Sequence, residues 1–204
     1  MQVIDNTAVK MTVPDYMVPH IEKEIEKFEV VGQKGNLSEV VIYWGVQEMT
    51  RLNQLVSFRK PLPSPITRDY DWPGVFEPFD HQKTTSEFLS INKRGFCFNE
   101  AGTGKTSSAL WAADYLMKLG LIKRVLIICP LSIMYSAWEA DVQNTVMHRT
   151  VGVAHGTQKK RELIIDEPFD FICINYDGVG IVRETIAKNN FDLIKEWLKM
   201  LKQI

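Results

Sequence analysis

The run Asn-Glu-Ala-Gly-Thr-Gly-Lys-Thr at residues 99–106 has residue types and a spacing that suit the binding of phosphate groups. Its two glycines can adopt backbone conformations closed to other residues, so successive N–H groups can point at one phosphate. The lysine can neutralise the β and γ phosphates, and the last threonine hydroxyl can bind the magnesium ion that bridges them. The run follows an expected strand and opens an expected helix, as a phosphate-binding loop requires. We therefore predict a Mg²⁺-ATP site formed by Gly102, Thr103, Gly104, Lys105 and Thr106, with Thr106 as the Mg²⁺ ligand.

The strict form of this loop begins with glycine, whereas this sequence has Asn99 at that position. A glycine-rich turn that caps an ordinary helix is therefore the alternative interpretation. The ending Gly-x-Gly-Lys-Thr between a strand and a helix favours the nucleotide site.

The region after residue 79 alternates short apolar runs with helical patterns. Apolar runs of this continuity are typical of parallel strands that are buried on both faces. We therefore predict an α/β fold in which helices cover a parallel sheet. The expected strands are Phe96–Phe98, Val125–Cys129, Thr150–Val153 and Phe171–Ile174, and the expected helices are His81–Leu89, Lys105–Leu119, Ser132–Thr145 and Gln158–Ile165.

A proline-rich segment precedes this region. Five of the nine prolines fall within residues 61–78, and such a segment favours extended chain over a helix or central strand. We predict a linker at 61–78, a small α+β accessory domain at 1–60 and the parallel-sheet domain at 79–204. Within the accessory domain the expected strands are Ala8–Val13 and Glu39–Trp44, and the expected helices are Pro19–Phe28 and Gln47–Phe58.

The composition is that of an ordinary globular chain of 204 residues with a net charge of -1. No general basic field attracts nucleic acid, so such binding must use local patches. No apolar run approaches the roughly 18 residues of a membrane span, and no signal peptide is recognisable, so the cytoplasm is the expected location. We expect the three cysteines, Cys97, Cys129 and Cys173, to be buried reduced thiols.

Four further stretches accompany the loop. They are Phe76–Gln82, Leu126–Ser132 with Trp138–Glu139 downstream, His155–Thr157 and Ile174–Asp177. Together with the loop they resemble superfamily-two helicases, and specifically the SWI/SNF-like DNA translocases, of which phage-encoded members are the most similar in style. The resemblance spans roughly residues 75–194 and implies that the parallel-sheet domain is a RecA-like lobe, in the host cytoplasm if the chain is phage-encoded.

The resemblance also implies roles for single residues. Gln82 would read the adenine edge of ATP, while Pro130, Ser132 and Tyr176 would contact the backbone of DNA. From residue types alone, Gln82 can instead be a surface residue at a helix start, and Ser132 can cap a helix. The basic run at 159–161 is either a solvated helix face or a further contact with the DNA backbone.

Two parts of the family's ATPase are not found: the second RecA-like lobe and the DExx motif, which follows a strand that begins like Phe191–Ile194. Residues 193–204 have the spacing of an amphipathic helix instead. We therefore expect an incomplete lobe that is inactive alone, shortened naturally, by a frameshift, by gene splitting or deliberately. The final helix either packs on its own lobe or docks to a second protein or chain segment that supplies the missing parts.

The leading prediction is the N-terminal ATP-binding portion of an ATP-dependent DNA helicase or translocase. One alternative is a binding module that docks to DNA or a partner lobe without hydrolysis. Another is a small complete P-loop NTPase, in which Leu163–Ile165 would be a strand and Asp166 and Glu167 the hydrolytic carboxylates. The charged residues before this run and Pro168 directly after it favour a helix and a loop there.

Overall fold

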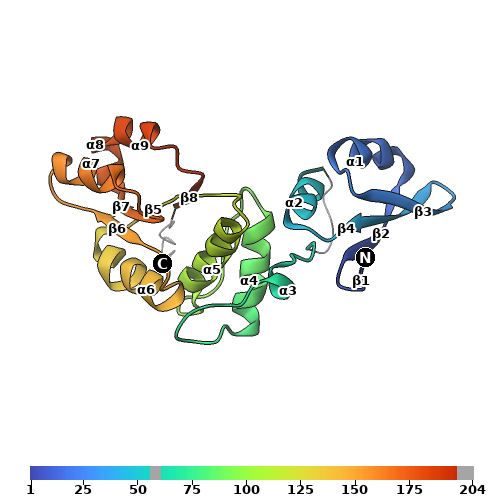
Figure 1. Cartoon of the computed structure of the whole chain (residues 1–204), viewed down its shortest axis with the longest axis horizontal. Coiled ribbons are helices and arrows are strands. Elements are labelled where there is room, and N and C mark those ends of the chain that lie inside the picture. The colour runs from blue at the N-terminus through green and yellow to red at the C-terminus, as the bar shows by residue number, and fades with distance from the viewer. Residues whose placement is uncertain (56–60, 197–204) are drawn as a thin grey trace, which may run out of the picture. The chain divides into compact units, whose positions relative to one another are not determined.

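The computed structural model describes residues 1–55 and 61–196, which belong to two compact units (Figure 1). The first unit consists of Met1–Asp71 with Lys83–Asn99, and the second of Trp72–Gln82 with the chain from Glu100 onward. Helix α4 (Asp80–Ile91) contributes residues to both units. The predicted division into residues 1–60, 61–78 and 79–204 stays a prediction.

The first unit is built on an antiparallel sheet in the order β1-β2-β4-β3. Alternate residues of the two central strands are buried, as expected for a sheet with one covered face. Ile21, Met49 and Leu52, from the two helices that follow the strands, are also buried. The elements are β1 (Gln2–Ile4), β2 (Ala8–Pro14), α1 (Val18–Glu24), β3 (Phe28–Lys34), β4 (Leu37–Tyr43) and α2 (Val46–Leu55).

Some sequence predictions for this unit are wrong. The helix expected at 19–28 ends at Glu24, because Ile25 is extended and Phe28 already begins β3. Strand β3 was not predicted, because most of its residues are exposed and show no apolar alternation. The proline-rich segment is not extended throughout, since the short helix α3 (Ile66–Asp69) follows Pro65. The last residues of the helix expected at 47–58 lie outside the described residues.

The second unit contains a parallel sheet in the order β6-β7-β5-β8, so the predicted α/β class, as in part of a RecA-like lobe, is confirmed. Its strands are β5 (Val125–Cys129), β6 (Val151–Ala154), β7 (Phe171–Asn175) and β8 (Leu193–Glu196). Strands β5 and β7 are almost wholly buried, which explains their continuous apolar sequence. The helices are α5 (Lys105–Lys118), α6 (Ala140–Thr145), α7 (Gln158–Asp166), α8 (Tyr176–Ile181) and α9 (Arg183–Lys188).

Three expected elements of the parallel-sheet region differ from the structure. Phe96–Phe98 is irregular chain and not a strand: both phenylalanines are largely exposed, and Asn99 Nδ2 donates to Thr85 Oγ1 on α4. The helix expected at 132–145 is divided into a 3-10 turn, a π-helix (Met134–Glu139) and α6. The Leu193–Glu196 part of the expected terminal helix is strand β8, and Trp197–Ile204 lies outside the described residues.

The start of β8 explains that last difference. The Asp192 carboxylate accepts hydrogen bonds from the N–H groups of Lys123 (2.8 Å) and Arg124 (3.2 Å), directly before β5. These bonds align the following residues with β5, and Leu193 pairs with Val125. Apolar residues spaced three or four apart therefore also fit a strand when the run is short.

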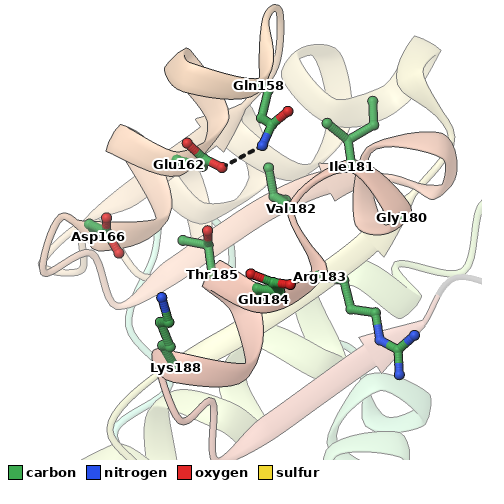
Figure 2. Close-up of a pocket in the computed structure, with 10 residues that line it drawn as sticks. All are labelled: Gln158, Glu162, Asp166, Gly180, Ile181, Val182, Arg183, Glu184, Thr185 and Lys188. Carbon is green, nitrogen blue, oxygen red and sulfur yellow. Dashed lines mark hydrogen bonds between the residues drawn. The ribbon is translucent and has the colours of Figure 1, made fainter.

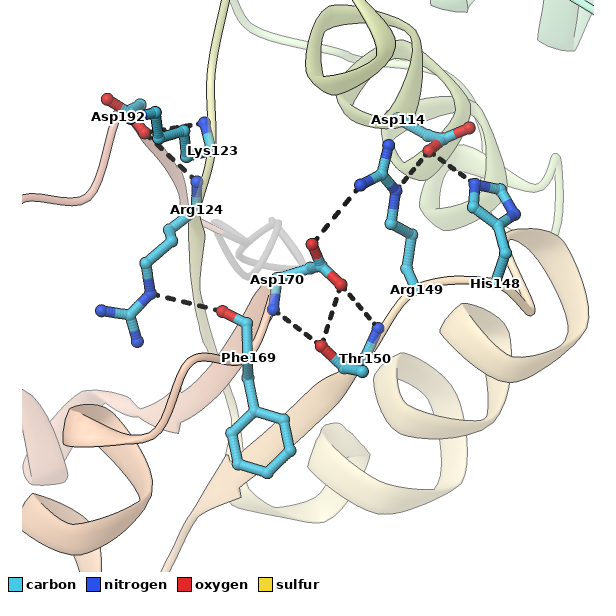
Figure 3. Close-up of polar contacts among 9 residues, drawn as sticks. All are labelled: Asp114, Lys123, Arg124, His148, Arg149, Thr150, Phe169, Asp170 and Asp192. Carbon is cyan, nitrogen blue, oxygen red and sulfur yellow. Dashed lines mark hydrogen bonds and ion pairs between the residues drawn. The ribbon is translucent and has the colours of Figure 1, made fainter. Parts of the chain in front are cut away.

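A network of charged residues fixes helix α5 to the sheet (Figure 3). The fully buried Asp114 of α5 accepts hydrogen bonds from His148 Nε2 (2.9 Å) and Arg149 Nε (2.6 Å), just before β6. Arg149 also pairs with Asp170 at 3.4 Å, directly before β7, and Asp170 accepts from the hydroxyl of Thr150. The network fixes the helix whose first turn follows the glycine-rich loop.

Two smaller findings concern the described part of the chain. No helix there is long and apolar enough to cross a membrane. The three thiols are free; Cys129 and Cys173 are buried, while Cys97 is partly exposed because the segment around it is not a strand. Burial raises the pKa of the Cys129 thiol to about 11.

Candidate nucleotide-binding loop

Both glycines of the loop have positive φ angles, +78° for Gly102 and +70° for Gly104. Gly104 occupies the N-cap position of α5 in the left-handed conformation, so the loop enters the helix through a turn that favours glycine. A Cβ atom on Gly102 would meet nothing within 4 Å, which leaves the backbone there open to a ligand. Two left-handed residues on either side of Thr103 give the loop the geometry in which N–H groups can converge.

Glu100 holds the side chains of the loop in place through its carbonyl oxygen. This oxygen accepts hydrogen bonds from Thr103 Oγ1 (2.8 Å) and from Lys105 Nζ (2.6 Å). The ammonium group of Lys105 is therefore folded back over the loop that it follows. A phosphate group placed in the loop would lie within reach of that charge.

The first turn of α4 packs directly against the loop. A Cβ atom at Gly104 would overlap the amide nitrogen of Gln82, so any side chain at position 104 would displace the end of Gln82. Gln82 is 9% exposed, and its Oε1 accepts a hydrogen bond from the N–H of Phe79 (2.9 Å). His81 Nε2 donates to the carbonyl oxygen of Thr103 at 3.1 Å. Gln82 is thus brought to the loop, as expected for a residue near the nucleotide, and is not an exposed surface residue.

Helix α6 lies along the first turn of α5. Thr106, the expected Mg²⁺ ligand, lies in this first turn. Ser107, one residue further, accepts a hydrogen bond from the hydroxyl of Thr145 at 3.4 Å. Partial burial raises the pKa of Asp141.

The expected nucleic-acid contacts follow two neighbouring strands of the sheet. Pro130 directly follows β5, and Ser132 lies exposed in the 3-10 turn Leu131–Ile133. Tyr176 directly follows β7 and is 37% exposed. Because β5 and β7 are parallel neighbours, their carboxyl ends meet at one edge of the sheet. The interpretation of Ser132 as a helix cap is wrong, because Pro130 occupies the N-cap position of that turn.

A second pair of side chains lies at the same edge. The hydroxyl of exposed Tyr135 and Nδ1 of His155 are 3.4 Å apart, and their rings meet edge to face. Tyr135 follows β5, and His155 directly follows β6. This edge of the sheet therefore carries exposed aromatic and hydroxyl groups from three neighbouring loops.

The basic run at 159–161 divides into two kinds of residue. Lys159 and Lys160 are exposed, whereas Arg161 is only 6% exposed. Arg161 Nη1 donates to the carbonyl oxygen of Ala154 (2.6 Å) and to Asn175 Oδ1 (2.8 Å), and Nε donates to Gly156 (3.0 Å). Both interpretations from the sequence are therefore wrong for Arg161, because its contacts are with the ends of β6 and β7.

The alternative with hydrolytic carboxylates at 166–167 is contradicted. Leu163–Asp166 belongs to helix α7, which Thr157 caps by accepting a hydrogen bond from the N–H of Lys160. Glu167 lies beside Arg124, since its carbonyl oxygen accepts from Arg124 Nη2 at 2.9 Å. Arg124 precedes β5, so Glu167 lies at the amino-terminal edge of the sheet, opposite the edge where α/β proteins bind ligands.

A polar pocket of about 530 Å³ lies between α7 and the chain from Gly180 to Lys188 (Figure 2). Its acidic residues include Glu162, which accepts a hydrogen bond from Gln158 (2.8 Å), and Asp166, which accepts one from Asn189 (2.8 Å). No residue of the glycine-rich loop lines this pocket. It is therefore separate from the candidate nucleotide site.

In the comparisons with known proteins, similarity is found among solved structures. No protein-family model and no characterised relative matches the sequence. Among solved structures, the chain is similar to the Sulfolobus solfataricus SWI2/SNF2 ATPase core in complex with dsDNA, at 26% identity and a TM-score of 0.44. The similarity covers 52% of this chain but only 23% of that protein, and a TM-score of this size does not assign the chain to a family.

Proposed function

We propose that this chain binds Mg²⁺-ATP through residues 100–106 and is the ATP-binding portion of an ATP-dependent DNA helicase or translocase. The observation that supports this most strongly is the pair of left-handed glycines on either side of Thr103, directly before the 14-residue helix α5. Converging N–H groups and the positive end of a helix stabilise the same phosphate charge.

The residues of the loop would contribute to nucleotide binding in different ways. The ammonium group of Lys105 would exchange the carbonyl oxygen of Glu100 for phosphate oxygens, which accept a stronger charge-assisted hydrogen bond. The Thr106 hydroxyl is an oxygen donor, the type of ligand that Mg²⁺ prefers, so it fits the ion. Bound Mg²⁺ would neutralise charge on the β and γ phosphates. Gln82 is the proposed contact with the adenine edge.

We further propose that the edge of the sheet after β5 and β7 contacts the backbone of DNA. Ser132 and Tyr176 offer hydroxyl groups there, and Pro130 fixes the start of the first of these loops. Contacts of this kind position a protein on DNA without reading its sequence.

We expect ATP turnover by this chain alone to be absent or very slow. None of the described residues forms the DExx motif, and the carboxylates at 166–167 lie at the opposite edge of the sheet from β5 and β7. Hydrolysis would require a second lobe and its carboxylates, from a partner or from another chain segment. The competing proposal is a module that binds DNA or a partner without any use for ATP.

Equilibrium titration with Mg²⁺-ATP tests the nucleotide site. The wild-type chain should bind ATP more tightly than AMP, because the loop recognises the β and γ phosphates. Lys105→Ala should weaken ATP binding by about 10-fold or more, the effect of losing a hydrogen bond from a charged donor. Lys118→Ala, in the last turn of the same helix, is the matched control and should bind like the wild type. Equal ATP affinity in the wild type and Lys105→Ala would exclude this site.

The DNA contact is tested separately, by fluorescence anisotropy with double-stranded DNA at two salt concentrations. Ser132→Ala and Tyr176→Ala should weaken binding on every DNA sequence to a similar degree, because backbone contacts carry no sequence information. If the wild type binds DNA and both variants bind it equally well, the proposed DNA-binding surface is wrong. The proposal for the ATP site is not affected by that result.

A further inference from the structure

Two exposed aromatic side chains contact each other at the carboxyl edge of the parallel sheet. Tyr135, in the segment after β5, is 49% exposed, and its hydroxyl lies 3.4 Å from Nδ1 of His155, the residue that follows β6. The ring centroids are 6.1 Å apart and the ring planes meet at 70°, an edge-to-face arrangement that fixes the orientation of both rings. Both side chains nonetheless remain open to solvent.

The backbone that carries Tyr135 is anchored by buried neighbours. Tyr135 belongs to the π-helix Met134–Glu139, in which Met134 is 0% and Trp138 is 1% exposed. Turns of this kind are rare and occur frequently at functional sites. The exposed ring therefore lies on a rigid support, which lowers the entropic cost of binding a ligand against it.

Two cations lie beside this ring pair. Lys159 and Lys160 are exposed in the first turn of α7, shortly after His155. The stem of Lys160 lies over Gly156, since a Cβ atom added to this glycine would be 3.4 Å from Lys160 Cδ. Because Gly156 directly follows His155, the ammonium group of Lys160 can reach a phosphate whose base meets the ring pair.

An unpaired nucleotide offers the two groups that suit this surface. The face of its base can stack on an aromatic ring, and its phosphate can pair with a lysine. In a duplex each base face is covered by the next base pair, so the rings could meet only the backbone and the groove edges. The surface is also continuous with the proposed backbone contact, because the hydroxyl of Ser136, next to Tyr135, donates to the carbonyl oxygen of Ser132 at 3.2 Å.

We propose that the ring pair Tyr135–His155 forms a stacking site for a base of single-stranded DNA, and that Lys160 pairs with an adjacent phosphate. The role rests on the proposed DNA contact at the same edge and names the form of DNA that uses it. Ser132 and Tyr176 contact the backbone of either form, whereas the ring pair acts only where a base is unpaired. Loss of such a stacking contact weakens binding by about 5- to 100-fold per base.

Fluorescence anisotropy of the whole chain tests this with three ligands of about 12 nucleotides. They are a single strand of mixed sequence, its duplex, and an abasic strand with the same sugar-phosphate backbone. The wild type should bind the single strand more tightly than the other two. Tyr135→Ala should weaken single-strand binding by about 5-fold or more and leave duplex binding unchanged. The abasic strand should bind the wild type and Tyr135→Ala equally, because it offers no base to the ring.

Four further variants separate the ring from the charges around it. Tyr135→Phe keeps the ring and should retain most of the affinity for the single strand. Lys160→Ala should weaken binding of both the single and the abasic strand and reduce the salt dependence, because it removes a phosphate contact. Asp177→Asn removes an exposed negative charge directly after Tyr176 and should strengthen both. Tyr16→Ala removes an exposed tyrosine of the first unit and, as the matched control, should bind like the wild type.

The other outcomes have distinct meanings. Equal binding of single strand and duplex, unchanged in Tyr135→Ala, would overturn the stacking site and leave the backbone contacts of Ser132 and Tyr176 in place. Equal losses in Tyr135→Phe and Tyr135→Ala would also overturn it, because the effect would then come from the hydroxyl. If the wild type binds none of the three ligands, the proposed DNA contact itself fails. Urea unfolding identifies a variant that has lost its fold, and His155→Ala, at the other ring, should show the same loss of single-strand binding as Tyr135→Ala.

Discussion

At the scale of single residues, Gly104 satisfies two requirements at once. Its φ of +70° favours glycine, and the side chain of Gln82 fills the space where a Cβ atom would lie. Gly120 has nearly the same φ, +69°, but nothing lies within 4 Å of its Cβ position. A substitution at Gly120 therefore introduces backbone strain alone, whereas one at Gly104 introduces both backbone strain and a steric clash.

This difference predicts the effects of two alanine substitutions. Both Gly104→Ala and Gly120→Ala should lower the free energy of unfolding by about 1–2 kcal/mol through strain in the left-handed region. Gly104→Ala should cost more, because Gln82 must move and lose its bond with the N–H of Phe79. Adding Gln82→Ala should recover part of that extra loss. Urea unfolding checks the prediction, and equal losses in the two single variants would contradict the packing argument.

At the scale of elements, Arg161 connects the ends of two neighbouring strands. Its guanidinium reaches the carbonyl oxygens of Ala154 and Gly156 after β6 and the side chain of Asn175 at the end of β7. Gly178 leaves room for this side chain, since a Cβ atom there would overlap Arg161 Nη1. The hydrogen bonds of Arg161 therefore connect the segment that carries His155 with the segment that leads into Tyr176.

Arg161→Met tests this connection. The change keeps much of the apolar stem but removes the donors of two buried hydrogen bonds and one partly buried one, and it should lower the free energy of unfolding by about 2 kcal/mol or more. Lys160→Met, on the exposed face one residue away, is the matched control and should change it by less than about 0.5 kcal/mol. Similar stabilities of the two variants would show that Arg161 does not hold the strand ends together.

At the scale of the whole molecule, the sequence predicted the parts whose pattern is local. Val125–Cys129 and Phe171–Ile174 are continuous apolar runs, and both are buried parallel strands. The two glycines before Lys105 also have the positive φ that the loop pattern allows.

Features that depend on distant contacts could not be predicted. Thr145 meets Ser107 only because two helices pack together, and a charged triplet does not reveal that Arg161 is its buried member. Leu193–Glu196 fitted a helix equally well until the pairing with β5 was known. The local pattern thus located the glycine-rich turn before α5, while the contacts that surround it required the fold.

The most direct test of the central claim is a ¹H–¹⁵N NMR titration of the whole chain with Mg²⁺-ATP. The backbone N–H groups of Gly102 and Gly104 should shift progressively and saturate, because a phosphate in the loop accepts hydrogen bonds from this backbone. Gly35 and Gly120 also have positive φ angles but lie outside the loop, and their signals should stay in place. ATP binding that leaves the signals of Gly102 and Gly104 unmoved, or no binding at all, would contradict a nucleotide site at residues 100–106.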